Sequence, residues 1–85
     1  MEQLERIFDF IAADSPTAAD RTIRRIRESI RRTAQMPFSG RVGRVSGTRE
    51  IPVPRTPYLV AYRVVDNSIH VVAVFHGAES WPSSL

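Results

Sequence analysis

The sequence predicts an α+β fold, with a helical hairpin packed on one face of a three-stranded antiparallel sheet. Apolar residues recur with a helical period in about the first 35 positions. From residue 48 onward the period changes to two, and the segments become rich in Val, Ile and Tyr, as is typical of strands. With 85 residues and a hydrophobic content of 42%, we expect a single domain over residues 1–85.

The first predicted helix covers about residues 2–13, and the second covers about residues 16–35. Between them, Ser15 is the expected N-cap and Pro16 the expected first residue of the second helix. Neither helix can bury its apolar stripe alone, so a sheet or a partner must cover both. The stripes are Leu4, Ile7, Phe8 and Ile11 in the first helix, and Ala19, Ile23, Ile26, Ile30 and Ala34 in the second.

Three strands are predicted, at about residues 48–53, 58–65 and 69–75. Pro52 cannot donate a ladder hydrogen bond, which indicates an edge position for the first strand. Between the other two strands, Asp66-Asn67 predicts a tight turn, because both residues tolerate positive φ.

A two-residue turn at this position sets the register of the last two strands. It places eight apolar or aromatic residues on one face, which we expect to pack on the helices, and a one-residue slip would mix the two faces. The predicted pairs are Val64 with Ile69, Tyr62 with Val71, Val60 with Ala73 and Tyr58 with Phe75. The opposite face then carries Leu59, Ala61, Arg63 and Val65 from one strand, against Val74, Val72, His70 and Ser68 from the other.

The charge is +3, and all twelve basic residues are arginines, which leaves an acidic protein and a nucleic acid open as partners. The absence of cysteine excludes disulfides and thiolate chemistry and fits a reducing cytoplasm. With His70 and His76 as the only histidines, we expect no metal and no other cofactor. No apolar run approaches the roughly 20 residues that a membrane span needs, so no membrane partner is expected.

Several short motifs follow the helical hairpin in a characteristic order. They are Pro37, Gly40-Arg41, the segment GTRE at 47–50, the segment YLVAYRV at 58–64, and VFHGA at 74–78 followed by Trp81-Pro82. Over nearly the whole chain, this order resembles the RelE/ParE superfamily of type II toxins, and it is closer to the ParE branch. Members of the superfamily usually begin with a β-strand of roughly ten residues, and we expect this chain to lack that strand, because Met1 stands at the start of the first predicted helix. A missing strand would leave one sheet edge open, from which we expect self-association or dependence on a partner.

The resemblance implies one of two activities. RelE-like members cleave mRNA in the ribosome, whereas ParE-like members inhibit DNA gyrase without hydrolysis. Members of both branches are silenced by a cognate antitoxin, and operator DNA is bound only through that antitoxin. The resemblance therefore implies a cytoplasmic toxin with an antitoxin partner.

Cleavage of RNA by its 2′-hydroxyl requires a base, an acid and cations that stabilise the charged phosphorane. The candidates for a nuclease are Arg49, Glu50 and His76, with His76 predicted on the same sheet face as Leu59. RelE-like members carry lysines at positions that correspond here to Glu50 and Pro52, and arginines at those of Leu59 and Glu79. They also carry a tyrosine near the C-terminus, whereas no tyrosine follows Tyr62 here. This loss of cations favours gyrase inhibition by binding. The alternatives are a ribosome-dependent endoribonuclease and an inactive remnant that sequesters the antitoxin.

The segment between the helices and the sheet is rich in arginine and glycine. Gly40, Gly43 and Gly47 allow a strongly bent connection, but they lack the pattern of a phosphate-binding loop. Arg41, Arg44 and Arg49 are interpreted as an arginine rim that docks an acidic antitoxin segment or the gyrase–DNA complex. The alternative is a soluble turn whose arginines are held by nearby carboxylates. Arg63 and Trp81 complete the predicted binding residues.

The second helix also carries arginines on its polar face. Such a run is usually a solvated surface with ion pairs between residues four apart, and it has no aromatic residues to stack on bases. Direct DNA binding by this face is therefore the least favoured interpretation. The charged residues are Arg21, Arg24, Arg25, Arg27, Glu28, Arg31 and Arg32.

Overall fold

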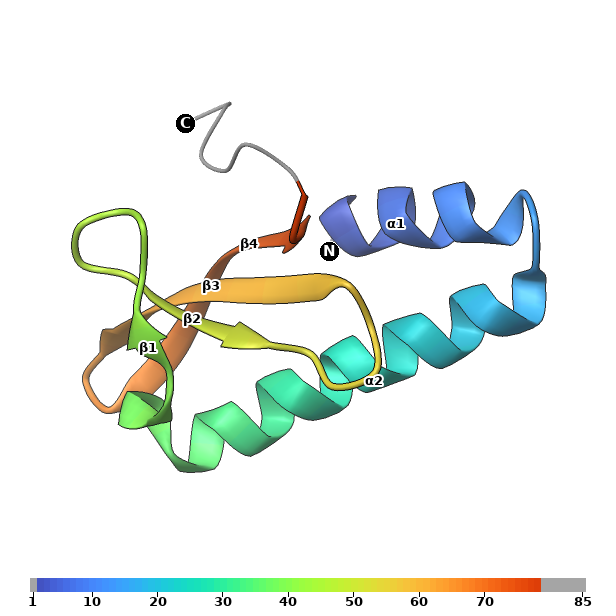
Figure 1. Ribbon diagram of the computed structural model, residues 1–85. Coiled ribbons are helices and arrows are strands. Elements are labelled where there is room, and N and C mark those ends of the chain that lie inside the picture. Colours follow the sequence, from blue (N-terminus) through green and yellow to red (C-terminus); the bar gives the residue numbers. More distant parts are fainter. Residues whose placement is uncertain (1, 79–85) are drawn as a thin grey trace.

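The computed structural model describes residues 2–78 and has two helices followed by an antiparallel sheet (Figure 1). This confirms the predicted α+β class. The helices are α1 (Glu2–Ala12) and α2 (Pro16–Gln35), followed by the short 3-10 helix η1 (Pro37–Ser39). The strands are β1 (Arg41–Val42), β2 (Arg49–Pro52), β3 (Tyr58–Val65) and β4 (Ser68–His76).

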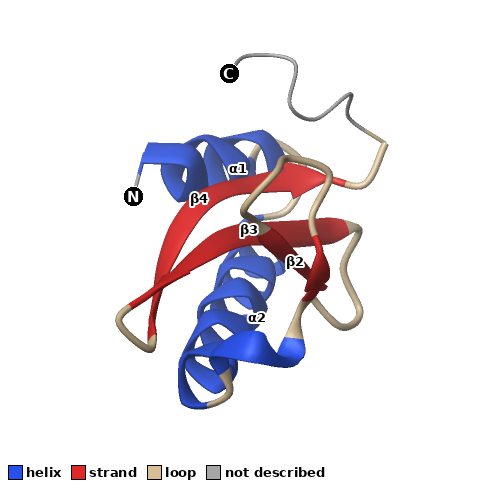
Figure 2. Cartoon of the chain, turned by 90° about the vertical axis from the view of Figure 1, so that its left-hand side faces the viewer, coloured by secondary structure: helices blue, strands red, loops and turns tan. Residues whose placement is uncertain are grey.

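The start of α2 follows from local signals in the chain. Ser15 has an extended backbone, and its side-chain oxygen accepts a hydrogen bond from the Ala18 amide at 3.2 Å. Pro16 occupies the first turn, where its missing N–H costs no hydrogen bond. The two helices pack against each other and against the sheet from the same side (Figure 2).

The sheet has the order β1-β2-β3-β4, and every neighbouring pair is antiparallel. The three predicted strands are present as β2, β3 and β4, but the predicted count of three is wrong, because Arg41–Val42 adds a fourth strand. Two residues are too short to produce an alternating pattern, so periodicity could not reveal β1. This strand places Arg41 directly opposite Glu50.

The core lies between the helices and the sheet. Leu4 of α1 and Ile26 of α2 pack with Val60 of β3 and Val74 of β4. Because these side chains are buried, the hydrophobic effect holds the two layers together. Other members of this core are Val53 and Tyr58, with Ile7, Ile11, Ile23, Ile30, Ile51 and Val71 packed around them.

The β3–β4 hairpin confirms the predicted turn and half of the predicted register. Asp66 and Asn67 have φ values of 52° and 62°, and Val64 pairs with Ile69 as expected. Tyr62 also pairs with Val71, as expected. Beyond this point an irregularity between Ala61 and Tyr62 shifts the register by one residue on β4.

The shift makes the remaining predicted pairs wrong. Val60 pairs with Val74 instead of Ala73, and Tyr58 pairs with His76 instead of Phe75. Ala73 and Phe75 therefore leave the helix-facing side, where they were predicted, and join a second buried cluster on the outer face of the sheet. That cluster consists of Leu59, Ala61, Ala73 and Phe75.

The outer edge of β4 is partly capped by α1. The amide of Val74 donates a hydrogen bond to the Gln3 side-chain oxygen at 3.0 Å. A capped amide is less available for pairing with another strand. Self-association through this edge stays a prediction.

Candidate functional site

Glu50 is the centre of the arginine rim. It lies on β2 opposite Ala61 of β3, on the outer face of the sheet, and its side chain is only 1% exposed. The Arg44 backbone amide donates to its Oε2 at 2.8 Å. Its Oε1 lies 3.6 Å from Arg41 Nη2 and 3.5 Å from Arg44 Nε. A buried carboxylate requires such partners, so Glu50 organises the fold of this segment.

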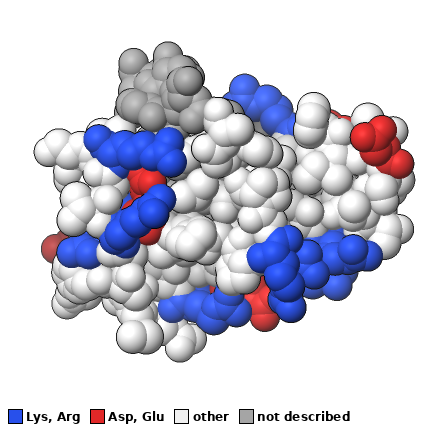
Figure 3. All heavy atoms as spheres, viewed as in Figure 1, with Lys and Arg blue, Asp and Glu red and all other residues white. Residues whose placement is uncertain are grey.

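The rim also covers the outer apolar cluster. The Arg44 guanidinium lies over the Phe75 ring, 5.1 Å from its centroid, within the range of a cation–π contact. On the same face, Arg63 Nη1 donates to the Ser46 carbonyl at 3.3 Å. Figure 3 shows positive side chains gathered around acidic atoms at the β1 end of the molecule.

Arg49 does not belong to this face. It pairs with Tyr62, which is on the helix-facing side. Its Nη1 donates to the carbonyls of Gly40 at 2.7 Å and Phe38 at 3.2 Å, and its guanidinium lies 5.2 Å from the centroid of the Phe38 ring. The predicted rim is thus divided between two faces of the sheet. Trp81, the other predicted binding residue, lies outside the described residues.

The three candidate nuclease residues are not brought together. Glu50 faces outward, whereas Arg49 and His76 lie on the helix-facing side. The β3 partners of Arg49 and His76 are Tyr62 and Tyr58, four residues apart, which corresponds to about 13 Å along the strand.

His76 also lies on a different face from the predicted one. It pairs with Tyr58 and packs edge-on against that ring, with 5.6 Å between centroids, so it does not share a face with Leu59. The register shift in β4 is the reason. Its Nδ1 accepts a hydrogen bond from the Ala78 amide at 3.0 Å.

Sequence reasoning missed an exposed apolar patch beside the rim. Met36, Phe38 and Val42 are 67%, 61% and 83% exposed. Phe38 and Val42 line a pocket of about 320 Å³ together with Arg49. The sequence did carry a signal, because three large apolar side chains lie within one seven-residue turn segment, 36–42. Such exposed apolar residues beside cations are typical of interaction surfaces.

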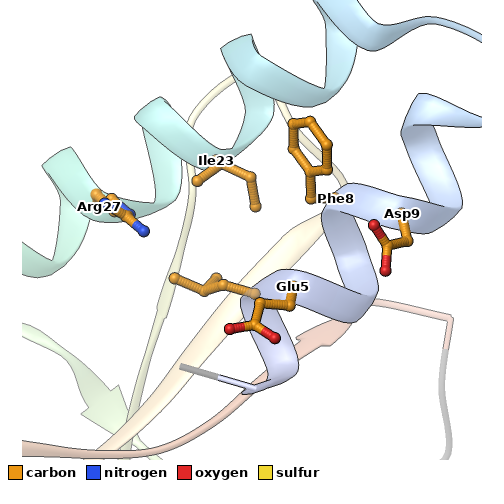
Figure 4. Close-up of a pocket in the computed structure, with 6 residues that line it drawn as sticks. Glu5, Phe8, Asp9, Ile23 and Arg27 are labelled. Carbon is orange, nitrogen blue, oxygen red and sulfur yellow. The ribbon is translucent and has the colours of Figure 1, made fainter.

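A groove of about 310 Å³ runs between the two long helices (Figure 4). Leu4, Phe8 and Ile23 supply its apolar lining. Glu5 and Asp9 line it from α1 and Arg27 from α2, with no ion pair across it. A groove with an apolar lining and charged residues at its border is better suited to binding an amphipathic segment than to catalysis.

The arginine face of α2, formed by Arg21, Arg24, Arg25, Arg27, Arg31 and Arg32, does not make the predicted ion pairs. Among residues 2–78, the two ion pairs within 4.0 Å both involve Glu50. Within the same range, no group of three His, Cys, Asp or Glu side chains could hold a metal ion. Neither described helix is long and apolar enough to cross a bilayer.

The chain is similar to known toxins. A family described as the ParE toxin of the type II toxin–antitoxin system parDE matches residues 1–81. "Putative toxin Y4kP" of Sinorhizobium fredii is 34% identical over 85 residues, covering 100% of this chain and 88% of that protein. "Toxin RelE2" of Caulobacter vibrioides is 32% identical over 78 residues, covering 92% of this chain and 86% of that protein.

A solved structure, a chromosomal ParDE toxin–antitoxin system from P. aeruginosa, has the same fold. Its TM-score is 0.76 at 22% identity, and the match covers 88% of this chain and 84% of that chain. At this level of identity the likeness concerns the fold alone.

Proposed function

Because this chain belongs to the ParE toxin family of type II toxin–antitoxin systems, we propose that it inhibits DNA gyrase by binding, without hydrolysis. Membership of this family implies a cognate antitoxin as its partner. We assign the activity to the bacterial cytoplasm, where the antitoxin neutralises the toxin by covering its target-binding surface.

The dispersal of Arg49, Glu50 and His76 carries this proposal. Cleavage by 2′-hydroxyl attack requires a base, an acid and cations at one phosphate. Glu50 is 1% exposed and is held by Arg41 and Arg44, so its carboxylate cannot reach a substrate. Arg49 is anchored to two backbone carbonyls about 13 Å along the sheet from His76. Binding is the activity that this arrangement favours.

The proposed contact surface combines the rim with the apolar patch. Protein interfaces typically place an apolar anchor at the centre of a polar border. Here Phe38 supplies the anchor, and the guanidinium of Arg49 lies over its ring. The hydrogen bonds of Arg49 pre-organise this surface, which lowers the entropy lost when a partner binds.

DNA supercoiling by purified gyrase tests the proposal, with cleaved linear DNA scored in the same gel. We expect inhibition together with accumulation of cleaved DNA. Phe38→Ala should raise the inhibitory concentration by about tenfold or more, the loss expected for an interface anchor. Phe10→Ala is the matched control, because Phe10 is also an exposed phenylalanine but lies on α1, and it should have little effect. Absence of inhibition by the folded chain would reject gyrase as the target.

The second candidate is ribosome-dependent mRNA cleavage, because one relative carries the name RelE2. Primer extension on mRNA from a translation reaction tests it, with Glu50→Gln and His76→Ala included after a circular dichroism check of folding. Specific cleavage that both substitutions abolish would overturn the gyrase proposal. A folded chain that is inactive in both assays but binds its antitoxin would be the inactive remnant.

A further inference from the structure

The positive charge of this protein is concentrated on α2. Six arginines and two carboxylates, Asp20 and Glu28, give the helix a net charge of +4. The whole chain carries +3, from twelve arginines and nine carboxylates. The other 65 residues therefore hold six arginines and seven carboxylates, a net charge of −1. One helix accounts for the entire positive charge.

The arginines of α2 are not neutralised within the described part of the chain. None lies within 4.0 Å of a carboxylate, and five of the six are exposed. The exception, Arg25, is partly buried, and its Nη1 donates to the carbonyl of Arg55 at 3.3 Å. In Figure 3, positive side chains crowd along the part of the surface that α2 forms.

The arginines of α2 are spaced so that they can contact the regularly repeated charges of a polyanion. Arg21 and Arg32 are eleven residues apart, so the run extends about 16 Å along the helix axis. Duplex DNA carries about one negative charge per 1.7 Å of its axis, so several phosphates fall within that length.

The chemistry of α2 favours DNA over an acidic protein. A protein interface needs apolar anchors at its centre. Among the described residues, α2 carries no exposed large hydrophobic side chain except Met36 at its C-cap. The helix also contains no aromatic residue for stacking on single-stranded bases. We propose that the arginine face of α2 binds the phosphate backbone of duplex DNA without reading its sequence.

The inference rests on the proposed function, because gyrase acts on duplex DNA. Contacts from α2 to the duplex would direct the toxin to gyrase that is already engaged with DNA. The rim and the apolar patch would meanwhile remain available for the enzyme. The ion pairs predicted along α2 are not formed among residues 2–78. The lack of aromatic residues, which also disfavoured DNA binding, concerns stacking on bases and not contacts with the backbone of a duplex.

Fluorescence anisotropy with a labelled duplex of about 20 base pairs tests the inference without gyrase, between about 50 and 200 mM salt. Arg31→Gln should reduce the slope of log affinity against log salt by about 0.9, and Arg24→Gln/Arg31→Gln by about 1.8. Arg6→Gln on α1 is the matched control, since it removes an exposed helical arginine outside the face. Arg and Gln have similar helix propensities, so the variants should stay folded, as thermal melts would verify.

The inference would be overturned if the folded protein did not bind the duplex at the lower salt, or if the α2 substitutions left binding unchanged. A clear preference for a polyglutamate peptide would also overturn it, because it would indicate that the face binds an acidic protein. Gyrase inhibition is scored separately. Inhibition without DNA binding would remove this inference alone, whereas DNA binding through α2 without inhibition would remove the proposed function alone.

Discussion

The rim and the arginine face of α2 use the same side chain in different surroundings. In the rim, Arg41 and Arg44 share the carboxylate of Glu50, whose side chain is 1% exposed. Along α2, no carboxylate of the described residues lies within 4.0 Å of a guanidinium. The rim arginines hold a segment of the fold, whereas those of α2 retain their charge for an external anion. The location of the counter-charge, rather than the number of arginines, separates arginines that are paired within the fold from arginines that have no carboxylate partner among the described residues.

The largest effect on stability is expected at Glu50, because its carboxylate is buried. Glu50→Ala removes the acceptor of the Arg44 amide and leaves a space against the outer apolar cluster. We expect the free energy of unfolding to fall by about 2–3 kcal/mol, as for a buried hydrogen bond to a charged group. Arg31→Ala, on α2, should change it by less than about 0.5 kcal/mol. Urea unfolding followed by circular dichroism measures both, and equal losses would remove the distinction between the regions.

A smaller effect is expected at Tyr62, which anchors the start of β1 from the helix-facing side. Its buried hydroxyl accepts from the Gly40 amide at 2.9 Å and donates to the Pro37 carbonyl at 2.8 Å. Tyr62→Phe leaves both backbone groups without this partner, so unfolding should become easier by about 1–2 kcal/mol. The same urea titration checks this, and an unchanged midpoint would mean that the rim does not depend on this anchor.

Some of this architecture could be predicted because its signals are local. Ser15 and Pro16 mark the start of α2, and Asp66-Asn67 marks the hairpin turn. The register shift in β4 could not be predicted, because residues 71–75 are all apolar. In such a run the alternation between apolar and polar residues is absent, so it cannot reveal where an extra residue is inserted.

A turn whose arginines are held by carboxylates was one of the two alternatives for the rim, but the sequence did not identify Glu50 as that carboxylate. Its partners Arg41 and Arg44 lie nine and six residues away and reach it only through the two-residue strand β1. The absence of ion pairs along α2 could not be predicted either. Glu28 has arginines three and four residues away on both sides, and this spacing would allow ion pairs. Exposed pairs contribute only about 0–1 kcal/mol, so suitable spacing does not ensure that they form.

Arg44→Gln separates the contribution of the Arg44 charge from that of the backbone hydrogen bond to Glu50. It removes the ion pair with Glu50 and the contact with Phe75, but it keeps the backbone amide that donates to Glu50. The Arg44 side chain is 40% exposed, so solvent screening should limit the loss of stability to about 0.5–1 kcal/mol. A loss as large as that of Glu50→Ala would assign the stability to the charge instead of the backbone hydrogen bond. Urea unfolding of the two variants under one condition decides between them.

The smallest predicted effect concerns Glu28, a carboxylate among the arginines of α2. Glu28→Gln removes a charge that repels phosphate, so duplex DNA should bind on the order of two- to fivefold more tightly. The salt slope should stay constant, because the new side chain neutralises no additional phosphate. Asp66→Asn in the β3–β4 turn makes the same change in net charge at an exposed position outside α2 and should leave the affinity as it was. If anisotropy measured equal gains for both, DNA would be responding to overall charge, and the arginine face of α2 would have no special role.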